Sequence, residues 1–261
     1  MPVLPKFVVD RLQPEARFGL RLTLFGLALV LVAVPFSYLL FEVIREGPFT
    51  RFDETTANDL NRLVTGNRWM IDGLHGISLM GKPLLLGICI AAGAIYAYRR
   101  GRQRLSLFLA FTAIGGGLVD SAVKIAVNRP RPVVEQPLAS AFGKSFPSGH
   151  AMSSTVTYGA LLLAFLPIVP KRWRWLAWLA TTTLVGAISM SRLFLGVHYV
   201  SDVVGGVVLG LAWLAGSAAM FEIWRAEAGV PKSHVTTEGL EPEAAKDLST
   251  AGAATSGHGS V

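Results

Sequence analysis

The sequence predicts an all-α, polytopic membrane protein with six transmembrane helices packed in a bundle. Hydrophobic residues make up 52% of the 261 residues and charged residues only 16%, against about a quarter in soluble domains. Apolar runs of eighteen or more residues recur, and a helix of that length can cross a bilayer. The bilayer core offers no water to backbone groups, so helices are expected. The predicted spans are Leu20–Phe41, Ile77–Tyr98, Leu105–Val127, His150–Val169, Trp173–Leu195 and Val197–Trp224.

Basic residues gather in the short loops between spans and predict the orientation. The loop Arg99–Arg104 reads "RRGRQR", and Lys171–Arg174 reads "KRWR". Short basic loops stay on the cytoplasmic side, so we expect a multi-pass protein of the cell (inner) membrane with both termini in the cytoplasm. The net charge of +7 is explained by charges at span ends, so no nucleic-acid partner is expected. The sequence leaves the oligomeric state open.

Three segments lie outside the predicted bundle of residues 20–225. Residues 1–19 are expected to be a cytoplasmic N-terminal segment. The first outer loop, Glu42–Gly76, interleaves acidic and basic residues and predicts short amphipathic surface helices. Residues 226–261 are rich in small and acidic residues, which cannot bury enough apolar surface to fold, so a disordered cytoplasmic tail is predicted.

With both termini inside, the unusual polar residues all fall on the outer side. At the end of the third span, Asp120 and Lys124 share one helix face. They can form only a salt bridge with each other, but we favour a mixed role in which the aspartate also steers the lysine toward a ligand. Pro130 and Pro132 then end the helix and hold Arg131 in an extended segment close to Lys124. Two such cations require an anion, which is either a lipid headgroup or a substrate phosphate.

The second polar stretch, "PSGH" at 147–150, opens the fourth predicted span. The start of a helix carries unpaired N–H groups and the positive end of the helix dipole, so it can bind a phosphate. Ser148 can cap the helix or contact the anion, and Gly149 allows close backbone approach. His150 adds a titratable ring. On its own this motif is most simply a helix cap.

The third stretch, "SRLFLGVHYVSD", places Asp202 one helical turn after His198, with Arg192 upstream. A carboxylate at that position can accept a hydrogen bond from Nδ1–H of the imidazole, which leaves Nε2 free as a nucleophile. Such a pair is also common as a structural contact or as part of a metal site. No cluster of Cys, Glu or Asp completes a metal shell. The sequence therefore favours a phosphoryl site with no metal and no cofactor.

Three polar motifs thus follow one another along the chain. In order, they are Lys124-x6-Arg131-Pro132, Pro147-Ser148-Gly149-His150 and Ser191-Arg192-x5-His198-x3-Asp202. Each motif is weak by itself, but the complete ordered set resembles the signature of the type 2 phosphatidic acid phosphatase family. The resemblance covers residues 20–225 and implies a helical bundle with its active site near the outer leaflet.

The resemblance also implies a role for each matched residue. His198 would attack phosphorus and become a phosphohistidine, Asp202 would orient it, and His150 would protonate the leaving oxygen. The remaining matched residues would bind the phosphate or shape the motifs. Phosphate binding falls to Lys124, Arg131, Ser148, Gly149 and Arg192, and a scaffold role to Pro132, Pro147 and Ser191.

The predicted function is hydrolysis of a membrane lipid phosphate or pyrophosphate, with undecaprenyl pyrophosphate as the first choice. Phosphatidylglycerophosphate and phosphatidic acid are the alternative substrates. Two other functions stay open: transfer of the phosphoryl group to an acceptor other than water, and lipid or phosphate translocation without turnover.

Overall fold

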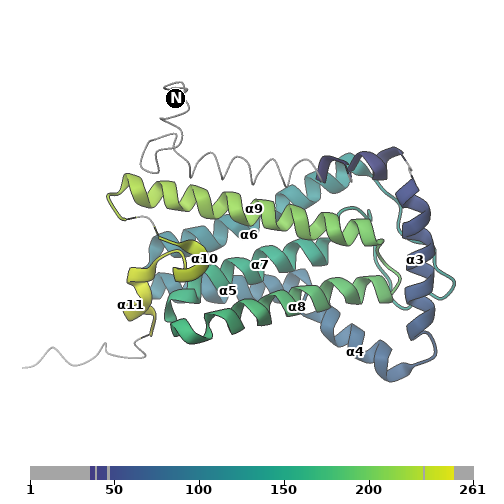
Figure 1. Cartoon of the computed structure of the whole chain (residues 1–261), viewed down its shortest axis with the longest axis horizontal. Helices are drawn as coiled ribbons and strands as arrows, with labels where there is room; N and C mark the ends of the chain where they lie inside the picture. Colours follow the sequence, from purple (N-terminus) through teal and green to yellow (C-terminus); the bar gives the residue numbers. More distant parts are fainter. Residues whose placement is uncertain (1–35, 39, 46–47, 232, 250–261) are drawn as a thin grey trace, which may run out of the picture.

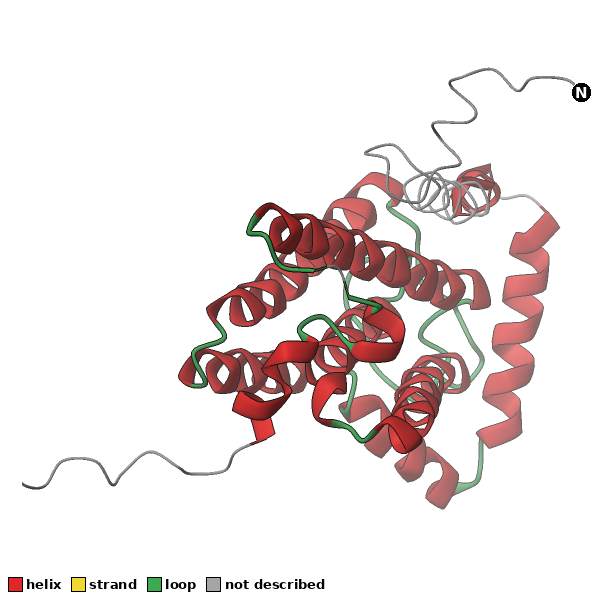
Figure 2. Ribbon diagram, turned by 60° about the vertical axis from the view of Figure 1, so that its left-hand side comes forward, coloured by secondary structure: helices red, strands yellow, loops and turns green. Residues whose placement is uncertain are grey.

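The computed structural model describes residues 36–38, 40–45, 48–231 and 233–249. Throughout this part of the chain the regular elements are helices, with no strand (Figure 2). Five long helices run side by side along the bundle (Figure 1). They are α5 (Pro83–Arg99), α6 (Gln103–Val127), α7 (Gly149–Phe165), α8 (Arg174–Phe194) and α9 (Val200–Glu227).

Four of these helices are long and apolar enough to cross a membrane. They are α6, α7 with its 3₁₀ extension to Ile168, α8 with the preceding turn from Lys171, and α9. A fifth span is obtained if α4 (Arg68–Leu79) and α5 count as one broken helix. The chain is therefore a multi-pass helical membrane protein. Most of the first predicted span, Leu20–Phe41, lies outside the described residues.

The second predicted span is not one continuous helix. The apolar run Ile77–Tyr98 is broken between Leu79 and Pro83, and α4 and α5 meet there at an angle of 42°. Pro83 has no N–H to continue a helix and favours its first turn. Gly81, inside the break, packs closely on the fourth span, because a Cβ there would lie 2.9 Å from Cδ2 of His150. The break thus lies against the start of α7 and against Ile188 of α8, the helix on which α4 packs.

Helix α7 forms the centre of the bundle and packs against α5, α6, α8 and α9. Glycines of α9 allow that helix to approach α7 closely. A Cβ at Gly206 of α9 would lie 2.6 Å from the carbonyl oxygen of Ser148, so only glycine fits there. A second glycine one turn later, Gly210, continues the contact. This small-residue face holds the start of α7 against the start of α9.

Helix α3 (Pro48–Val64) crosses the end of the bundle where α6 ends and where α7 and α9 begin (Figure 1). It packs against α8 and α9. Asn61 Nδ2 donates a hydrogen bond to the carbonyl oxygen of Phe194, 3.3 Å away, at the last residue of α8. The region 42–76, for which short amphipathic helices are predicted, contains α3 and the first part of α4.

The prediction of a disordered tail from residue 226 is wrong up to Ser249. The tail forms α10 (Val235–Glu238), the 3₁₀ turn η3 (Pro242–Ala244) and α11 (Ala245–Ser249). Leu240, Ala244 and Leu248 are fully buried in the main core cluster, beside residues of α6, α7 and α9. Three spaced apolar side chains anchor a segment whose average composition is polar. Residues 250–261, like the predicted cytoplasmic segment 1–19, lie outside the described residues.

Candidate active site

All three polar motifs meet at the α3 end of the bundle (Figure 1). The Lys124 ammonium donates to the carbonyl oxygen of Pro147 at 2.8 Å, which joins the first motif to the second. The backbone N–H of Ser148 donates to the carbonyl oxygen of Asp202 at 2.9 Å, which joins the second to the third. Arg131 Nη1 lies 3.1 Å from Nε2 of His198, which joins the first motif to the third. The predicted motifs therefore form one cluster.

His198 lies in the turn just before α9 and is only 2% exposed. Its Nδ1 is 3.3 Å from Oδ2 of Asp202, and its Nε2 faces Arg131. A guanidinium can only donate hydrogen bonds, so Nε2 must accept, and the ring proton must sit on Nδ1, pointing at the carboxylate. Burial lowers the pKa of His198 below its usual range, while Asp202 opposes that shift. Both contacts fit a neutral ring that has its lone pair on Nε2.

The Asp202 carboxylate is fully buried and held on both oxygens. Oδ2 accepts hydrogen bonds from the Ser145 hydroxyl and from the backbone N–H of Tyr199, the latter at 2.9 Å. Oδ1 accepts from Arg129 Nη1 at 2.7 Å. Because both oxygens are engaged, the carboxylate cannot rotate away from the imidazole.

Three buried polar atoms of the predicted site have no hydrogen-bond partner in the described part of the chain. They are Oγ of Ser148, Nε2 of His150 and Nε of Arg192. Buried polar atoms are rarely left unpaired in proteins, so such a group needs an explanation. The start of α7 adds backbone N–H groups that have no acceptor within the helix. A bound phosphate oxygen would satisfy these donors.

The Lys124 ammonium already has two partners, the Pro147 carbonyl and Asp120 Oδ1 at 2.5 Å. The third ammonium hydrogen is left for a ligand. A Cβ at Gly149 would lie 3.2 Å from Nζ, so the glycine leaves the space that the lysine side chain uses. Both possibilities raised by the sequence are thus compatible: Asp120 pairs with Lys124 and also steers it toward the start of α7.

Several positively charged side chains surround His150 in this cluster. Arg131, Arg192 and Lys82 all act electrostatically on His150. Arg192 is 7% exposed and donates through Nη1 to the Ser78 hydroxyl at the end of α4. Within the described residues no group of three or more His, Cys, Asp or Glu side chains is placed to hold a metal ion.

The model of the PAP2 superfamily matches residues 105–225, a range that contains all three motifs. Phosphatidylglycerophosphatase B of Bacillus subtilis is 31% identical over 55% of this chain and 71% of that protein. The chain belongs to the PAP2 superfamily. The predicted membership of the type 2 phosphatidic acid phosphatase family is confirmed, and with it the prediction of a phosphatase.

Other PAP2 relatives carry different substrate names. Lipid A 1-phosphatase of Rhizobium etli is 30% identical over 68% of this chain and 76% of that protein. Decaprenylphosphoryl-5-phosphoribose phosphatase of Mycobacterium tuberculosis is 31% identical over 54% of this chain and 75% of that protein. The crystal structure of a transmembrane PAP2-type phosphatidylglycerolphosphate phosphatase from Bacillus subtilis has the same fold. Its TM-score is 0.68 at 24% identity, over 75% of this chain and 96% of that chain.

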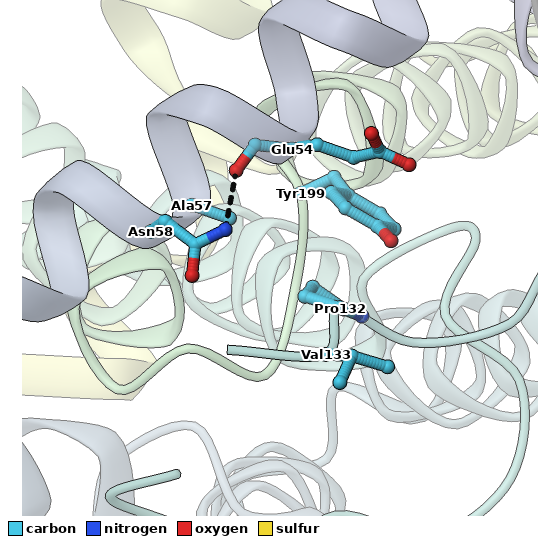
Figure 3. Close-up of a pocket in the computed structure, with 6 residues that line it drawn as sticks. All are labelled: Glu54, Ala57, Asn58, Pro132, Val133 and Tyr199. Carbon is cyan, nitrogen blue, oxygen red and sulfur yellow. Dashed lines mark hydrogen bonds between the residues drawn. The ribbon is translucent and has the colours of Figure 1, made fainter. Parts of the chain in front are cut away.

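A polar cavity of about 210 Å³ lies beside the PAP2 motifs, between α3 and the segment after Arg131 (Figure 3). Asn58 Nδ2 donates to the Glu54 carbonyl oxygen at its wall, 3.1 Å away. The cavity is lined by Glu54, Ala57, Asn58, Pro132, Val133 and Tyr199, so neither histidine borders it. Pro132, for which the family resemblance implies a scaffold role, thus faces this cavity. Ser191 donates its hydroxyl to the Ile188 carbonyl within α8.

Four polar residues for which the sequence predicted no role lie within the PAP2 motifs or against them. Ser145 and Arg129 bond Asp202, Ser78 bonds Arg192, and Asp53 bonds Arg129. The sequence could have indicated a role for Arg129, because this charged residue lies just after a helix end and two residues before Arg131 in "NRPRP". No comparable indication exists for Asp53, since it is one of several acidic residues on a helix far from the motifs in sequence.

Proposed function

We propose that this protein is an integral membrane phosphatase that hydrolyses a lipid phosphate or diphosphate through a phosphohistidine at His198. One observation carries the proposal. The buried imidazole of His198 has Nδ1 3.3 Å from Oδ2 of Asp202 and Nε2 3.1 Å from Nη1 of Arg131, so we infer that its proton is on Nδ1 and its lone pair on Nε2. This arrangement suits a nucleophile that attacks beside a cation, because the guanidinium can shift from Nε2 to the phosphate oxygens when the substrate binds.

In the proposed reaction, Nε2 of His198 attacks phosphorus while the bond from phosphorus to the leaving oxygen breaks. His150 donates a proton to that oxygen, and the lipid product leaves. Water then attacks phosphorus, the bond between phosphorus and Nε2 of His198 breaks, His150 accepts a proton from the water, and inorganic phosphate departs. Cations stabilise the charge that spreads over the equatorial oxygens. They are Lys124, Arg131 and Arg192, assisted by Ser148 and the start of α7.

Undecaprenyl pyrophosphate stays our first choice of substrate. The relatives are named for phosphatidylglycerophosphate, lipid A and decaprenylphosphoryl-phosphoribose, so phosphate monoesters on different lipids belong in the same test. We also propose that the site faces the outer side of the cell membrane, with both termini in the cytoplasm. The basic loop between α5 and α6, Arg99–Arg104, lies at the opposite end of the bundle from the start of α9 (Figure 1), which supports that orientation.

The test is phosphate release by the purified protein in detergent from undecaprenyl pyrophosphate, phosphatidylglycerophosphate and phosphatidic acid. His198→Ala should lose nearly all release. His234→Ala, at an exposed histidine in the tail, should retain it and serves as the matched control. Full activity of His198→Ala would refute the proposed nucleophile.

The same assay separates the two alternative functions. A phosphotransferase would give a phosphorylated alcohol in place of free phosphate when glycerol is supplied as an acceptor. A translocator without turnover would release no phosphate from any of the lipids, and lipid binding would survive His198→Ala.

A further inference from the structure

Helix α3 reaches into the site through one buried carboxylate. Asp53 is 1% exposed and bonds residues at the start of α9. Its Oδ1 accepts the backbone N–H of Ser201 at 3.1 Å, and its Oδ2 accepts the Ser201 hydroxyl. The first N–H groups of a helix have no acceptor within the helix, and a cap residue usually provides one. Here the carboxylate comes from another helix, so α3 caps α9.

Arg129 links this carboxylate to Asp202. Its Nη2 donates to Asp53 at 2.9 Å, while its Nη1 donates to Oδ1 of Asp202 at 2.7 Å and to the Ser201 hydroxyl at 2.7 Å. The guanidinium also lies 4.1 Å from the ring centre of Tyr199. The result is a continuous buried chain from α3 through Arg129 to the carboxylate beside His198.

Burying these charges constrains their geometry. A buried ion pair is stable only when its hydrogen bonds are satisfied, and removal of one partner leaves a buried charge without compensation. Asp53, Arg129 and Asp202, the three charged groups of this hydrogen-bonded network, are each at most 8% exposed. Arg129 holds Oδ1 of Asp202, so Oδ2 of the same carboxylate stays directed at Nδ1 of the imidazole.

We propose that Asp53 and Arg129 are positioning residues that fix Asp202, and through it the attack angle of His198. This inference rests on the proposed function, because it requires His198 to be the nucleophile. Helix α3 is then part of the catalytic apparatus, although none of the side chains described for it is hydrogen-bonded to the imidazole. A displacement of about 1 Å at a reacting group can cost on the order of 10² in rate.

The test is a double-mutant cycle on kcat with Asp53→Asn and Asp202→Asn, using the purified full-length protein and the best lipid substrate. Asp53→Asn should lower kcat about 10- to 100-fold and change KM less than about threefold, because the phosphate-binding side chains are untouched. On the Asp202→Asn background the same change should cost less than about twofold, since residues that act through one group are not additive. Asp59→Asn, at an exposed carboxylate on the same helix, should behave like the wild type.

Equal losses from Asp53→Asn on both backgrounds would overturn the inference and leave only a structural role. Unchanged kcat in Asp53→Asn would overturn it too, while phosphate release that depends on His198 would keep the proposed function standing. Wild-type activity in His198→Ala would instead remove the proposed function.

If Asp53→Asn does not give a monodisperse protein, Ser201→Ala replaces it in the cycle. This change removes a hydroxyl that bonds both Asp53 and Arg129 and leaves every charge in place. It should lower kcat by a smaller factor, and that loss should also disappear on the Asp202→Asn background.

Discussion

Replacing Asp202 by asparagine should inactivate the protein through the tautomer of His198. Arg129 only donates, so it needs the amide oxygen of the new side chain where Oδ1 now lies. The amide NH2 then faces Nδ1 of His198, where a carboxylate oxygen stood. The ring must accept at Nδ1, its proton moves to Nε2, and no lone pair remains for attack on phosphorus.

The expected loss follows from that change of proton position. An asparagine that places a catalytic histidine in the wrong tautomer lowers kcat by about 10⁴, equivalent to a barrier increase of about 5 kcal/mol. The assay is phosphate release under saturating lipid, with Ser145→Ala as the control. That control removes one hydrogen bond to Asp202 but keeps the carboxylate, and it should cost about tenfold or less. A kcat for Asp202→Asn within tenfold of wild type would refute the tautomer argument.

The same variant should shift the pH profile. Attack requires neutral His198, so activity is present above the pKa of His198 and is lost as the pH falls through it. Burial lowers that pKa, Asp202 raises it, and Arg131 and Arg192 lower it. Removing the Asp202 charge lowers the pKa of His198 further. The acid limb of kcat/KM, which reports the free enzyme, should therefore move to lower pH in the residual activity of Asp202→Asn. A shift to higher pH would contradict the assignment.

Three further outcomes are expected. His150→Ala should lower kcat by about 10²–10⁴ on a lipid phosphate, and clearly less on p-nitrophenyl phosphate, whose leaving group needs no proton. Equal losses on both substrates would exclude His150 as the acid. Phosphate release should survive EDTA and be inhibited by vanadate, which resembles five-coordinate phosphorus, whereas loss with EDTA that Mg²⁺ restores would contradict a reaction driven by side-chain cations. Arg225→Ala should cost about 3 kcal/mol of stability, because this buried guanidinium bonds Glu222, Glu243 and the Leu240 carbonyl. Thermal unfolding in detergent measures that loss, with exposed Arg172→Ala as control, and an unchanged midpoint would refute a stabilising role for the tail.

Local spacing predicted the contacts that one helix turn can make. The pairs Asp120–Lys124 and His198–Asp202 are four residues apart, and the structure shows both in contact. The start of α7 at Gly149 also follows from its local sequence, since "PSGH" has the composition of a helix start. The convergence of the three motifs was expected from the family resemblance, and the structure brings them to one end of the bundle.

Contacts between distant segments were not predictable from one sequence. No feature of the local sequence distinguishes Asp53 from its neighbours Glu54 and Asp59. The fold alone determines which of these carboxylates faces Arg129. The break between α4 and α5 had a signal in Gly81 and Pro83, but the apolar run around it hid that signal. The ordered tail depends on Arg225 in another helix, so the composition of the tail alone predicted the wrong state.

The most direct test of this account is to identify the residue that carries phosphate during turnover. Rapid quenching of the reaction with ³²P-labelled lipid, followed by peptide mapping under alkaline conditions, would locate an acid-labile phosphoryl group. We expect it on the peptide that contains His198, and we expect no label in His198→Ala. Label on a different residue, or steady turnover with no phosphorylated protein at any quench time, would contradict the proposed mechanism.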